Sequence, residues 1–508
     1  MTYGFTGKAL AAAILSLAMT GGALAAVTAD EVWQNWQEVS AASGQTLEAA
    51  SALRSGDTLT VTDMIMQMQS PEGVVKGVVP RVSFRETGDG RVEITMSERY
   101  NFRMSMTTPS GKTNSNNLTI RQNAMLLMAS GDPGAINYDV TAESVSFTMQ
   151  DFVVDDAPQD MRIDLDLSGL LASYLVVQGD PIQVTSNFSG KSLRFAVDGK
   201  DDSGSGAIKV SGQMSGLAGF ANNPMTGLAA GKDFVAMLAG GIAADFAFTY
   251  DEGAMTIGVV DEKGSTTDIR TTSKGGKLNF AMDNGGLTYG AAGKAVTVSV
   301  QGSAIPFPDV TAAYDEASFD LRFPLAKADT PQDFAFSTRL KGLTVSDFLW
   351  NMIDPGASLP RDPATLIVET KGKAMPLVDL FDEAEMQQRL KSGPPVEVQS
   401  FDVTRLQLSV AGVELLGDAA LTFDNTKPLM QGGMTPMPAG KVNLSLSGGN
   451  GLLGKLQALG LVQPDMVMGF GLFSGMLAKP GPTPDSLVTE IDIQEDGRIL
   501  ANGNPLPF

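Results

Sequence analysis

The sequence feature that most constrains the fold is a period-two alternation of apolar and polar residues, which recurs along most of the 508-residue chain. Neighbouring side chains on a β-strand point to opposite faces of a sheet, so each run forms one apolar and one polar face. Turn-forming clusters of Gly, Asp and Asn separate the runs. The sequence therefore predicts a mainly β fold, with long antiparallel curved sheets, one apolar inner face and a few flanking or capping helices. The main runs are Val92/Ile94/Met96/Tyr100/Phe102/Met104/Met106, Ile136/Tyr138/Val140, Val145/Phe147/Met149, Met161/Ile163/Leu165/Leu167, Leu193/Phe195/Val197, Val296/Val298/Val300 and Leu406/Leu408/Val410.

The first 25 residues have the pattern of a cleavable export signal. Lys8 precedes an apolar segment over 9–19, and Ala23-Leu24-Ala25 supplies the small residues that a signal peptidase requires. The apolar segment is too short to span a bilayer, which weighs against a membrane anchor. We therefore predict a signal peptide over 1–25, a periplasmic location and no transmembrane span in the mature chain.

The mature chain is strongly acidic. Removing residues 1–25 takes away one lysine, which leaves 35 basic and 57 acidic residues and a net charge of −22. Phosphate-rich partners would be repelled, so nucleic acid is not an expected partner. Any contact with lipid would have to be apolar rather than electrostatic.

The chain contains neither histidine nor cysteine. These residues supply most nucleophilic catalysis, proton transfer and transition-metal binding in proteins, and cysteine alone forms disulfides. Their absence leaves carboxylate pairs as the main device for acid–base catalysis, and it favours a non-catalytic role. We expect no cofactor and no metal site.

A Gly-, Ala- and Met-rich stretch over 220–244 breaks the alternation and predicts a boundary between two β-rich halves, 26–240 and 241–508. Asp30 is the predicted N-cap of an early helix that carries Trp33 and Trp36. Further helices are predicted in the second half near 345–352, 375–390 and 451–478.

Two apolar segments are candidate walls of a ligand site. Methionines alternate near residue 64, where core packing, a flexible ligand wall and a copper(I) site are alternative explanations. The segment over 466–477 is the most hydrophobic of the mature chain, and a capping helix pair, a lid or a membrane contact would each explain it. The candidate lining residues are Met64, Met66, Met68, Phe102, Met104, Met106, Met468, Phe470, Leu472 and Phe473.

Other motifs give weaker signals. Gly449, Gly451 and Gly454 match the GxGxxG dinucleotide pattern, but antiparallel signals surround them and Asp465 follows too early for that fold. The acidic pairs Asp155/Asp156, Asp201/Asp202 and Glu383/Glu385 lie in turn-like or helix-surface contexts, where solvated carboxylates are the ordinary explanation.

Three segments together resemble an uncharacterised alphaproteobacterial family, domain of unknown function 2125. They are EVWQNWQEVSAASGQ, the central DFLWNMIDPGASLPRDPATLIVETKGKA, and the C-terminal region from GLLGKLQALGLVQPDM to EIDIQEDGRILANGNPLPF. The hairpins AALTFDN and KVNLSLSGG are also similar in style to AsmA-type periplasmic envelope proteins. That likeness implies a curved sheet with an apolar inner face, and the family implies no activity.

The leading hypothesis is an exported envelope protein that binds an apolar, lipid-like ligand without catalysis or assists envelope assembly. A carboxylate-dependent hydrolase of envelope glycans is one alternative, and it requires two converging carboxyl groups. A scaffold that binds another envelope protein through a sheet edge is the other.

Overall fold

A computed structural model describes residues 26–70, 73–108, 110–200, 204–225, 243–283, 285–305, 307, 310–429 and 435–506. The predicted signal peptide and the acidic pair Asp201/Asp202 lie outside the described residues. The fold is mainly β, with 65% of residues in strands and 12% in helices, and the strands form one large antiparallel sheet, as predicted.

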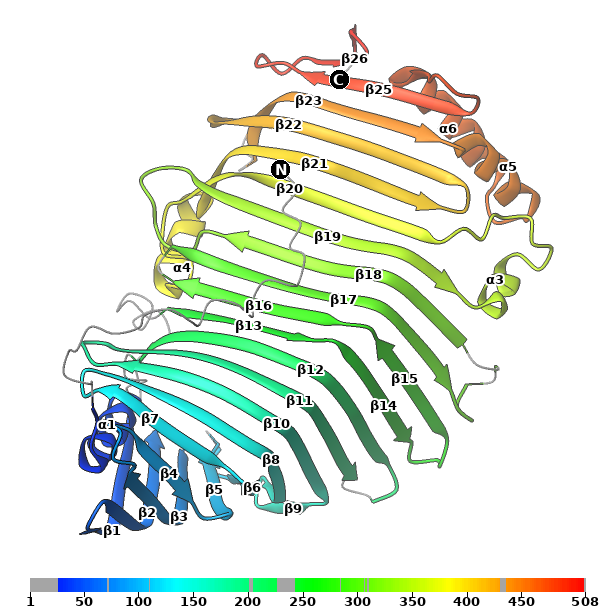
Figure 1. The fold of residues 1–508 in the computed structure, drawn as a ribbon. Helices are drawn as coiled ribbons and strands as arrows, with labels where there is room; N and C mark the ends of the chain where they lie inside the picture. The colour runs from blue at the N-terminus through cyan, green and yellow to red at the C-terminus, as the bar shows by residue number, and fades with distance from the viewer. Residues whose placement is uncertain are drawn as a thin grey trace.

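The N-terminal strands curl around one helix, α1 (Ala29–Ala42) (Figure 1). The other helices in the described ranges are α3 (Asp347–Ile353), α4 (Glu383–Ser392), α5 (Gly449–Ala458) and α6 (Pro464–Leu477). The strands of the N-terminal curl are β1 (Gln45–Ser55), β2 (Thr58–Ser70), β3 (Gly73–Glu86), β4 (Val92–Met96), β5 (Arg99–Thr107), β6 (Thr113–Asn123) and β7 (Leu126–Asp132).

Longer strands follow and form the body of the sheet. The middle strands are β8 (Ala135–Val154), β9 (Ala157–Gln159), β10 (Met161–Val177), β11 (Ile182–Lys200), β12 (Ala207–Met225), β13 (Ala244–Tyr250), β14 (Glu252–Val260), β15 (Thr266–Ser273), β16 (Gly276–Asp283), β17 (Gly286–Gln301), β18 (Val310–Phe323) and β19 (Gln332–Val345). The C-terminal strands are β20 (Ala364–Pro376), β21 (Val396–Val410), β22 (Val413–Pro428), β23 (Pro436–Ser447), β24 (Lys479–Pro480), β25 (Ser486–Ile493), β26 (Ile499–Ala501) and β27 (Asn504–Pro505).

The sheet is a continuous meander. Strands β4 and β5 lie end to end and both pair with β3, and β13 and β14 in the same way both pair with β12. The predicted boundary at residue 240 falls in 226–242, outside the described residues. The strands on its two sides, β12 and β13, pair with each other, so both halves share one sheet.

A crease crosses the sheet from β2 to β19. Residues with positive φ mark it in many of the strands, among them Asp63 (φ 46°), Gly169 (60°), Gly216 (63°) and Gly342 (68°). A left-handed residue inside a strand breaks the pleat, and it favours glycine because glycine has no Cβ. Each strand therefore bends at this line.

The apolar pattern shifts by one residue at the crease and so stays on one face. In β8, Ala142 and Val145 are both buried, whereas Glu143 and Ser144 between them are exposed. The hydroxyls of Tyr250 and Ser273, which lie on opposite sides of the crease, are 3.1 Å apart. An unbroken alternation would move the apolar residues to the opposite face beyond the bend. The step of three residues from Ala142 to Val145, in place of the usual two, keeps the apolar side chains on one face over the full length of the strand.

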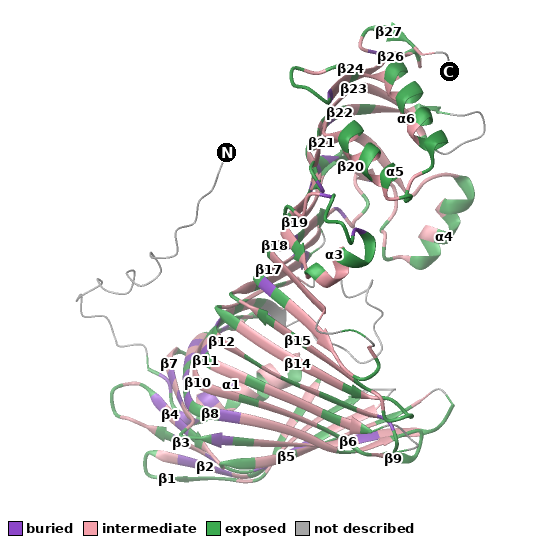
Figure 2. Ribbon diagram, turned by 90° about the vertical axis from the view of Figure 1, so that its right-hand side faces the viewer, coloured by how far each residue is buried: buried purple, intermediate pink, exposed green. Residues whose placement is uncertain are grey.

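We call this face the inner face, because α1 packs on it, and the opposite one the outer face. Buried residues gather around α1 (Figure 2), where Val32, Val61, Phe84, Ile94 and Tyr138 form a core. Trp33 and Trp36 of α1 lie with their ring centroids 6.0 and 5.1 Å from that of Phe84.

The helix boundaries agree with the prediction except at two places. The N-cap of α1 is Thr28 rather than Asp30, because Thr28 and Glu31 form a reciprocal capping box. Helix α4 begins at Glu383 rather than at 375, because Met375 and Pro376 belong to β20 and Asp382 caps the helix. Figure 1 shows α3, α5 and α6 at one end of the strands and α4 at the other.

Candidate apolar binding face

Cross-strand partners on the inner face form rows without a charged residue. In an antiparallel sheet, directly opposed residues share a face, so the register shows which side chains lie together. One row runs Tyr138, Tyr174, Ser186, Ala221, Phe246, Phe280, Tyr289, Leu321, Phe336, Thr370, Val403, Ala419, Val442 and Ile491. A second runs Val140, Ala172, Phe188, Gly219, Phe248, Leu278, Ala291, Phe319, Thr338, Val368, Leu406, Gly417, Leu444 and Thr489.

A leucine row lies beside these two in the C-terminal part. Six leucines are opposed in turn on consecutive strands from β19 to β25, and they are Leu340, Leu366, Leu408, Leu415, Leu446 and Leu487. The inner face is therefore apolar from one end of the sheet to the other, which confirms the predicted one-sided strands.

Aromatic rings on this face contact each other along the sheet. Tyr138 and Tyr174 stack at a centroid distance of 4.6 Å, and Phe246 and Phe280 stack at 5.4 Å. Phe319 meets Phe336 edge to face at 5.4 Å. Such pairs prefer offset or edge-to-face geometry and leave their outer surface free for an apolar partner.

Among the described residues, the inner face is fully buried under α1 and is mostly half-exposed from β11 onward. Tyr138 is fully buried under α1, whereas Phe319 keeps 36% of its surface exposed. Most inner-face residues from β11 onward are of intermediate exposure, as the pink strands in Figure 2 show. Contiguous apolar surface of this extent marks a binding surface in soluble proteins.

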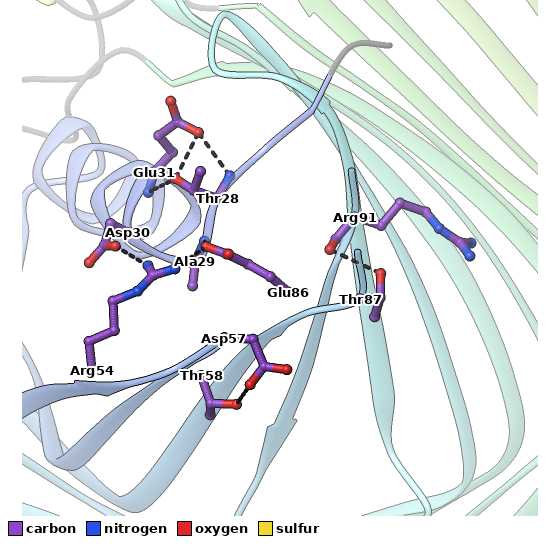
Figure 3. A network of polar contacts seen from close by, with 10 residues as sticks. All are labelled: Thr28, Ala29, Asp30, Glu31, Arg54, Asp57, Thr58, Glu86, Thr87 and Arg91. Carbon is purple, nitrogen blue, oxygen red and sulfur yellow. Dashed lines mark hydrogen bonds and ion pairs between the residues drawn. The ribbon is translucent and has the colours of Figure 1, made fainter. Parts of the chain in front are cut away.

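Helix α1 is fixed in place by a polar network at its first turn (Figure 3). The backbone N–H of Ala29 donates to Glu86 Oε1 at 3.0 Å, and Arg54 bridges Glu86, at 2.6 Å, and Asp30. These bonds lower the pKa of Glu86, first through the Ala29 N–H and then through Arg54. The network ties the helix to β1 and β3, so α1 is a fixed plug at the N-terminal end of the inner face.

The predicted methionine wall lies on the inner face. Met66 of β2 and Phe102 of β5 are both opposed to Gly77 of β3, and a Cβ on Gly77 would lie 2.1 Å from the Phe102 ring. Met68 and Met104 flank Val75 in the same way. The wall is therefore assembled across three strands, with Met106 exposed at its rim opposite Gly73.

Met64 has a different role, because it is 3% exposed and belongs to the core under α1. Its position fits core packing, which was one of the three explanations for the alternating methionines. No group of three or more Asp and Glu side chains that could hold a metal occurs in the part of the chain that the structure describes.

The candidates near 470 lie on α6, at the other end of the sheet from β2 and β5 (Figure 1). Phe470 is half-buried, 3.9 Å from where a Cβ on Gly449 would lie. Met468, Leu472 and Phe473 are exposed, with Leu472 at 69%. The ten predicted lining residues therefore do not form one site, and the two groups occupy opposite ends of the inner face.

Helix α6 is joined to the inner face at its C-terminus. The carbonyl of Leu477 accepts hydrogen bonds from the Thr489 hydroxyl, which belongs to the second inner-face row, and from Asn502 Nδ2 at 2.9 Å. Among the described residues no helix is both long and apolar enough to cross a membrane.

The glycines of the GxGxxG match lie in α5, and the amides of Asn450 and Gly451 in its first turn already have an acceptor. Asp485 accepts from the N–H of Gly451 at 2.9 Å and of Asn450 at 3.1 Å, which lowers its pKa. A carboxylate from the chain itself thus fills the position that a phosphate would take at a helix N-terminus.

The described acidic pairs do not converge in a cleft. Asp155 and Asp156 form the exposed turn between β8 and β9, and Glu383 and Glu385 lie exposed in the first turn of α4. A glycosidase acid requires a raised pKa, and every carboxyl for which a shift is resolved in the described ranges has a lowered one, such as Asp89 and Asp424.

Most aromatic residues of the two rows are candidate binding residues that the sequence patterns did not single out. Phe246/Phe248 and Phe334/Phe336 do alternate, and that signal could have identified the two strands. Their alignment with Tyr174 and Phe280 depends on cross-strand register, which no single segment encodes.

No family model, no curated protein and no solved structure matches this chain. The resemblance to the uncharacterised alphaproteobacterial family therefore stays a prediction.

Proposed function

We propose that this protein binds an elongated apolar ligand, such as a lipid acyl chain, along its inner face. The observation that carries the proposal is the pair of charge-free rows from β8 to β25, which among the described residues have no continuous second layer over them beyond α1. An apolar ligand would remove these side chains from water, at roughly 25 cal/mol per Å² of apolar surface buried.

The chemistry of the face selects the ligand class. An uncharged, aromatic- and leucine-rich surface offers dispersion contacts and almost no hydrogen bonds, so it suits methylene chains rather than sugars or peptides. Helix α1 closes one end of the face, and α6 with its exposed Leu472 and Phe473 stands at the other. A ligand would therefore lie across β10 to β25 and enter from the C-terminal end.

A matched pair of variants tests the proposal. Phe280→Glu places a charge on the inner face, and Asn279→Glu places the same charge on the outer face of the same strand. We expect the first to abolish binding of a fluorescent fatty acid and the second to leave it unchanged, with both proteins folded by circular dichroism. Equal binding by the two variants, or no binding by the wild type, would refute the proposal.

Native mass spectrometry of the protein from its own cells is the complementary measurement. We expect lipid masses in near-stoichiometric amounts on the wild type and their loss from Phe280→Glu. Protein that is free of any adduct under conditions that retain lipid on a known carrier would count against the proposal.

We also propose that the protein is exported to the periplasm, on the basis of the sequence pattern at Ala23-Leu24-Ala25. N-terminal sequencing of protein from the periplasmic fraction is expected to begin at Ala26. A mature protein that retains Met1 would refute this.

Binding of another envelope protein through β1 is a second candidate, favoured by the state of the sheet edges. Strand β1 pairs with β2 alone among the described strands, and over 11 residues it has no proline and two charged residues, Glu48 and Arg54. The opposite edge is less suited to pairing with an added strand, because it consists of the short strands β26 and β27 and contains Pro505. A long open edge of this kind can accept an added strand.

A photo-crosslinking amino acid in place of Leu53, which is 69% exposed on β1, tests this second candidate. The same amino acid in place of the exposed Leu416 on the interior strand β22 is the control. We expect one defined segment of a partner to be captured at position 53 only, and a peptide of that segment to bind wild type but not Leu53→Pro. Identical capture at both positions would exclude the edge.

A further inference from the structure

The outer face of β3, β5, β6 and β8 contains an open hollow of about 630 Å³ that is lined by three cations, Lys76, Arg99 and Arg103. It lies on the other side of the sheet from the methionine wall. Lys76 and Arg103 alternate with Gly77 and Phe102, which belong to the inner face. The hollow therefore opens on the outer face, and Phe102 is the one residue of the methionine wall that also contributes to its lining.

The cations stand in like-charge pairs. Lys76 is directly opposed to Arg103 across β3 and β5, and Arg99 is directly opposed to Arg121 across β5 and β6. Like charges in directly opposed positions destabilise a sheet. Two such pairs on one strand require a compensating anion or a functional reason.

In the part of the chain that the structure describes, no acidic side chain forms an ion pair with these cations. The chain has 57 acidic and 36 basic residues, and Lys112, just before β6, and Arg162, which donates to Gln150 of the hollow lining, both form ion pairs. Within the described ranges none of the four cations does so. Asp151, the one carboxylate that lines the hollow, accepts a hydrogen bond from Asn117 Nδ2 at 2.9 Å.

Asn101 and Thr119 lie between the two pairs, next to the apolar side chain of Val78. Arg99 and Arg103 are four residues apart on β5, which corresponds to about 13 Å along a strand. Asn101 lies between them on the same face and accepts from the Thr119 hydroxyl at 2.9 Å, which leaves its amide N–H groups free to donate. Amides and hydroxyls of this kind bind the hydroxyl groups of sugars.

We propose that this hollow binds a saccharide that carries two phosphate groups, one at each cation pair. Arginine binds phosphate through two parallel N–H groups, and such charge-assisted bonds are about twice as strong as neutral ones. The bound phosphates would relieve the repulsion within each pair, and Asn101 would contact the sugar between them.

Calorimetric titration with glucose 1,6-bisphosphate tests the site, with glucose and inorganic phosphate as reference ligands. We expect the bisphosphate to bind more tightly than either reference and more weakly as salt rises. Arg99→Gln/Arg103→Gln should weaken binding at least about tenfold. The control double variant Lys263→Gln/Lys391→Gln removes the same amount of charge elsewhere and should leave the affinity for the bisphosphate unchanged. Absence of binding to wild type, or an equal loss in both variants, would overturn the proposal.

Vesicle flotation separates the two sources of such a saccharide. Phosphatidylcholine vesicles with and without a bisphosphorylated glycolipid are compared with the soluble sugar. Retention by the glycolipid vesicles identifies a lipid headgroup as the ligand, and binding of the soluble sugar alone identifies a free sugar phosphate. If neither the glycolipid vesicles nor the soluble sugar bind, the proposal of a bisphosphate site is overturned. That result would not bear on the apolar ligand proposed for the inner face.

A stability measurement excludes a merely structural role for the cations. Without ligand, Arg99→Gln should raise the urea midpoint, because it removes a like-charge contact. The bisphosphate should raise the midpoint of wild type and not that of the double variant. A lower midpoint for ligand-free Arg99→Gln would show that the arginine holds the fold together and would overturn the proposal.

Discussion

The hydroxyl of Tyr138 donates a 2.7 Å hydrogen bond to Oδ1 of Asn35, and both side chains are buried between β8 and α1. This bond is the polar contact at the centre of the plug that closes the inner face. Burial raises the pKa of Tyr138, with the neighbouring Tyr174 adding to the rise, so the hydroxyl stays protonated and remains a donor.

Tyr138→Phe should destabilise the protein by about 1–3 kcal/mol, because Asn35 Oδ1 would be buried without a donor. Urea unfolding measures the loss. Asn35→Leu/Tyr138→Phe removes both polar groups and should recover part of it. Tyr100→Phe, whose hydroxyl has no hydrogen bond among the described residues, is the control, and a loss there equal to that of Tyr138→Phe would contradict the argument.

Glu86 should make the stability of the N-terminal curl depend on pH. Its pKa lies below the ordinary 4.5, because the Ala29 N–H and Arg54 bind the ionised form. A lowered pKa in the folded state gives stability that is complete above pH 4.5 and is lost as the pH falls below it. Glu86→Gln should therefore flatten the fall in urea midpoint between pH 6 and 3. Glu93→Gln, in an exposed ion pair with Arg85, should preserve the wild-type slope.

The crease should tolerate no side chain at Gly216. Its φ is +63°, and a Cβ there would lie 2.1 Å from Asp251 Oδ2 and 2.8 Å from Asp251 Cβ. Gly264 has a similar φ of +80° with nothing within 4 Å. Both alanine variants incur about 1 kcal/mol of backbone strain, and Gly216→Ala should lose about 1–3 kcal/mol more from the clash. Equal thermal midpoints would contradict this, whereas partial rescue by Asp251→Gly would confirm it.

Asp485 should hold the first turn of α5. Asp485→Ala removes the acceptor of the Asn450 and Gly451 amides and should cost about 1 kcal/mol, with faster hydrogen exchange at those two amides. Asp465→Ala, in the first turn of α6, is the control, because the N-cap of that helix has no side-chain hydrogen bond. Unchanged exchange at Gly451 in Asp485→Ala would refute the capping role.

The sequence predicted the strands well but divided them in the wrong places. Ile136/Tyr138/Val140 and Val145/Phe147/Met149 look like two short strands, and in the structure they are the two ends of β8. The phase of the alternation changes between Ala142 and Val145, and a pattern search treats such a change as a break. The crease that causes it is a property of many strands together, so one segment cannot reveal it.

Local features can be predicted from the sequence alone, whereas contacts between distant strands cannot. The capping box of Thr28 and Glu31 lies within four residues and could have been found from the sequence. Asp30, the predicted N-cap, instead pairs with Arg54 of β1. Likewise, alternation identifies Met66 and Phe102 as members of apolar faces, but only the pairing of both with β3 places them side by side.

Because consecutive strands, or strand halves lying end to end, pair along the chain, the sheet can assemble in the order in which the chain is made. Once β1 has paired with β2, each following hairpin adds to an existing sheet edge. Strand pairing therefore involves partners that are close in sequence. The unpaired edge of the growing sheet moves forward with synthesis until the short strands around Pro505 end it. The topology thereby allows a chain of this length to fold through a series of pairings between strands that are close in sequence.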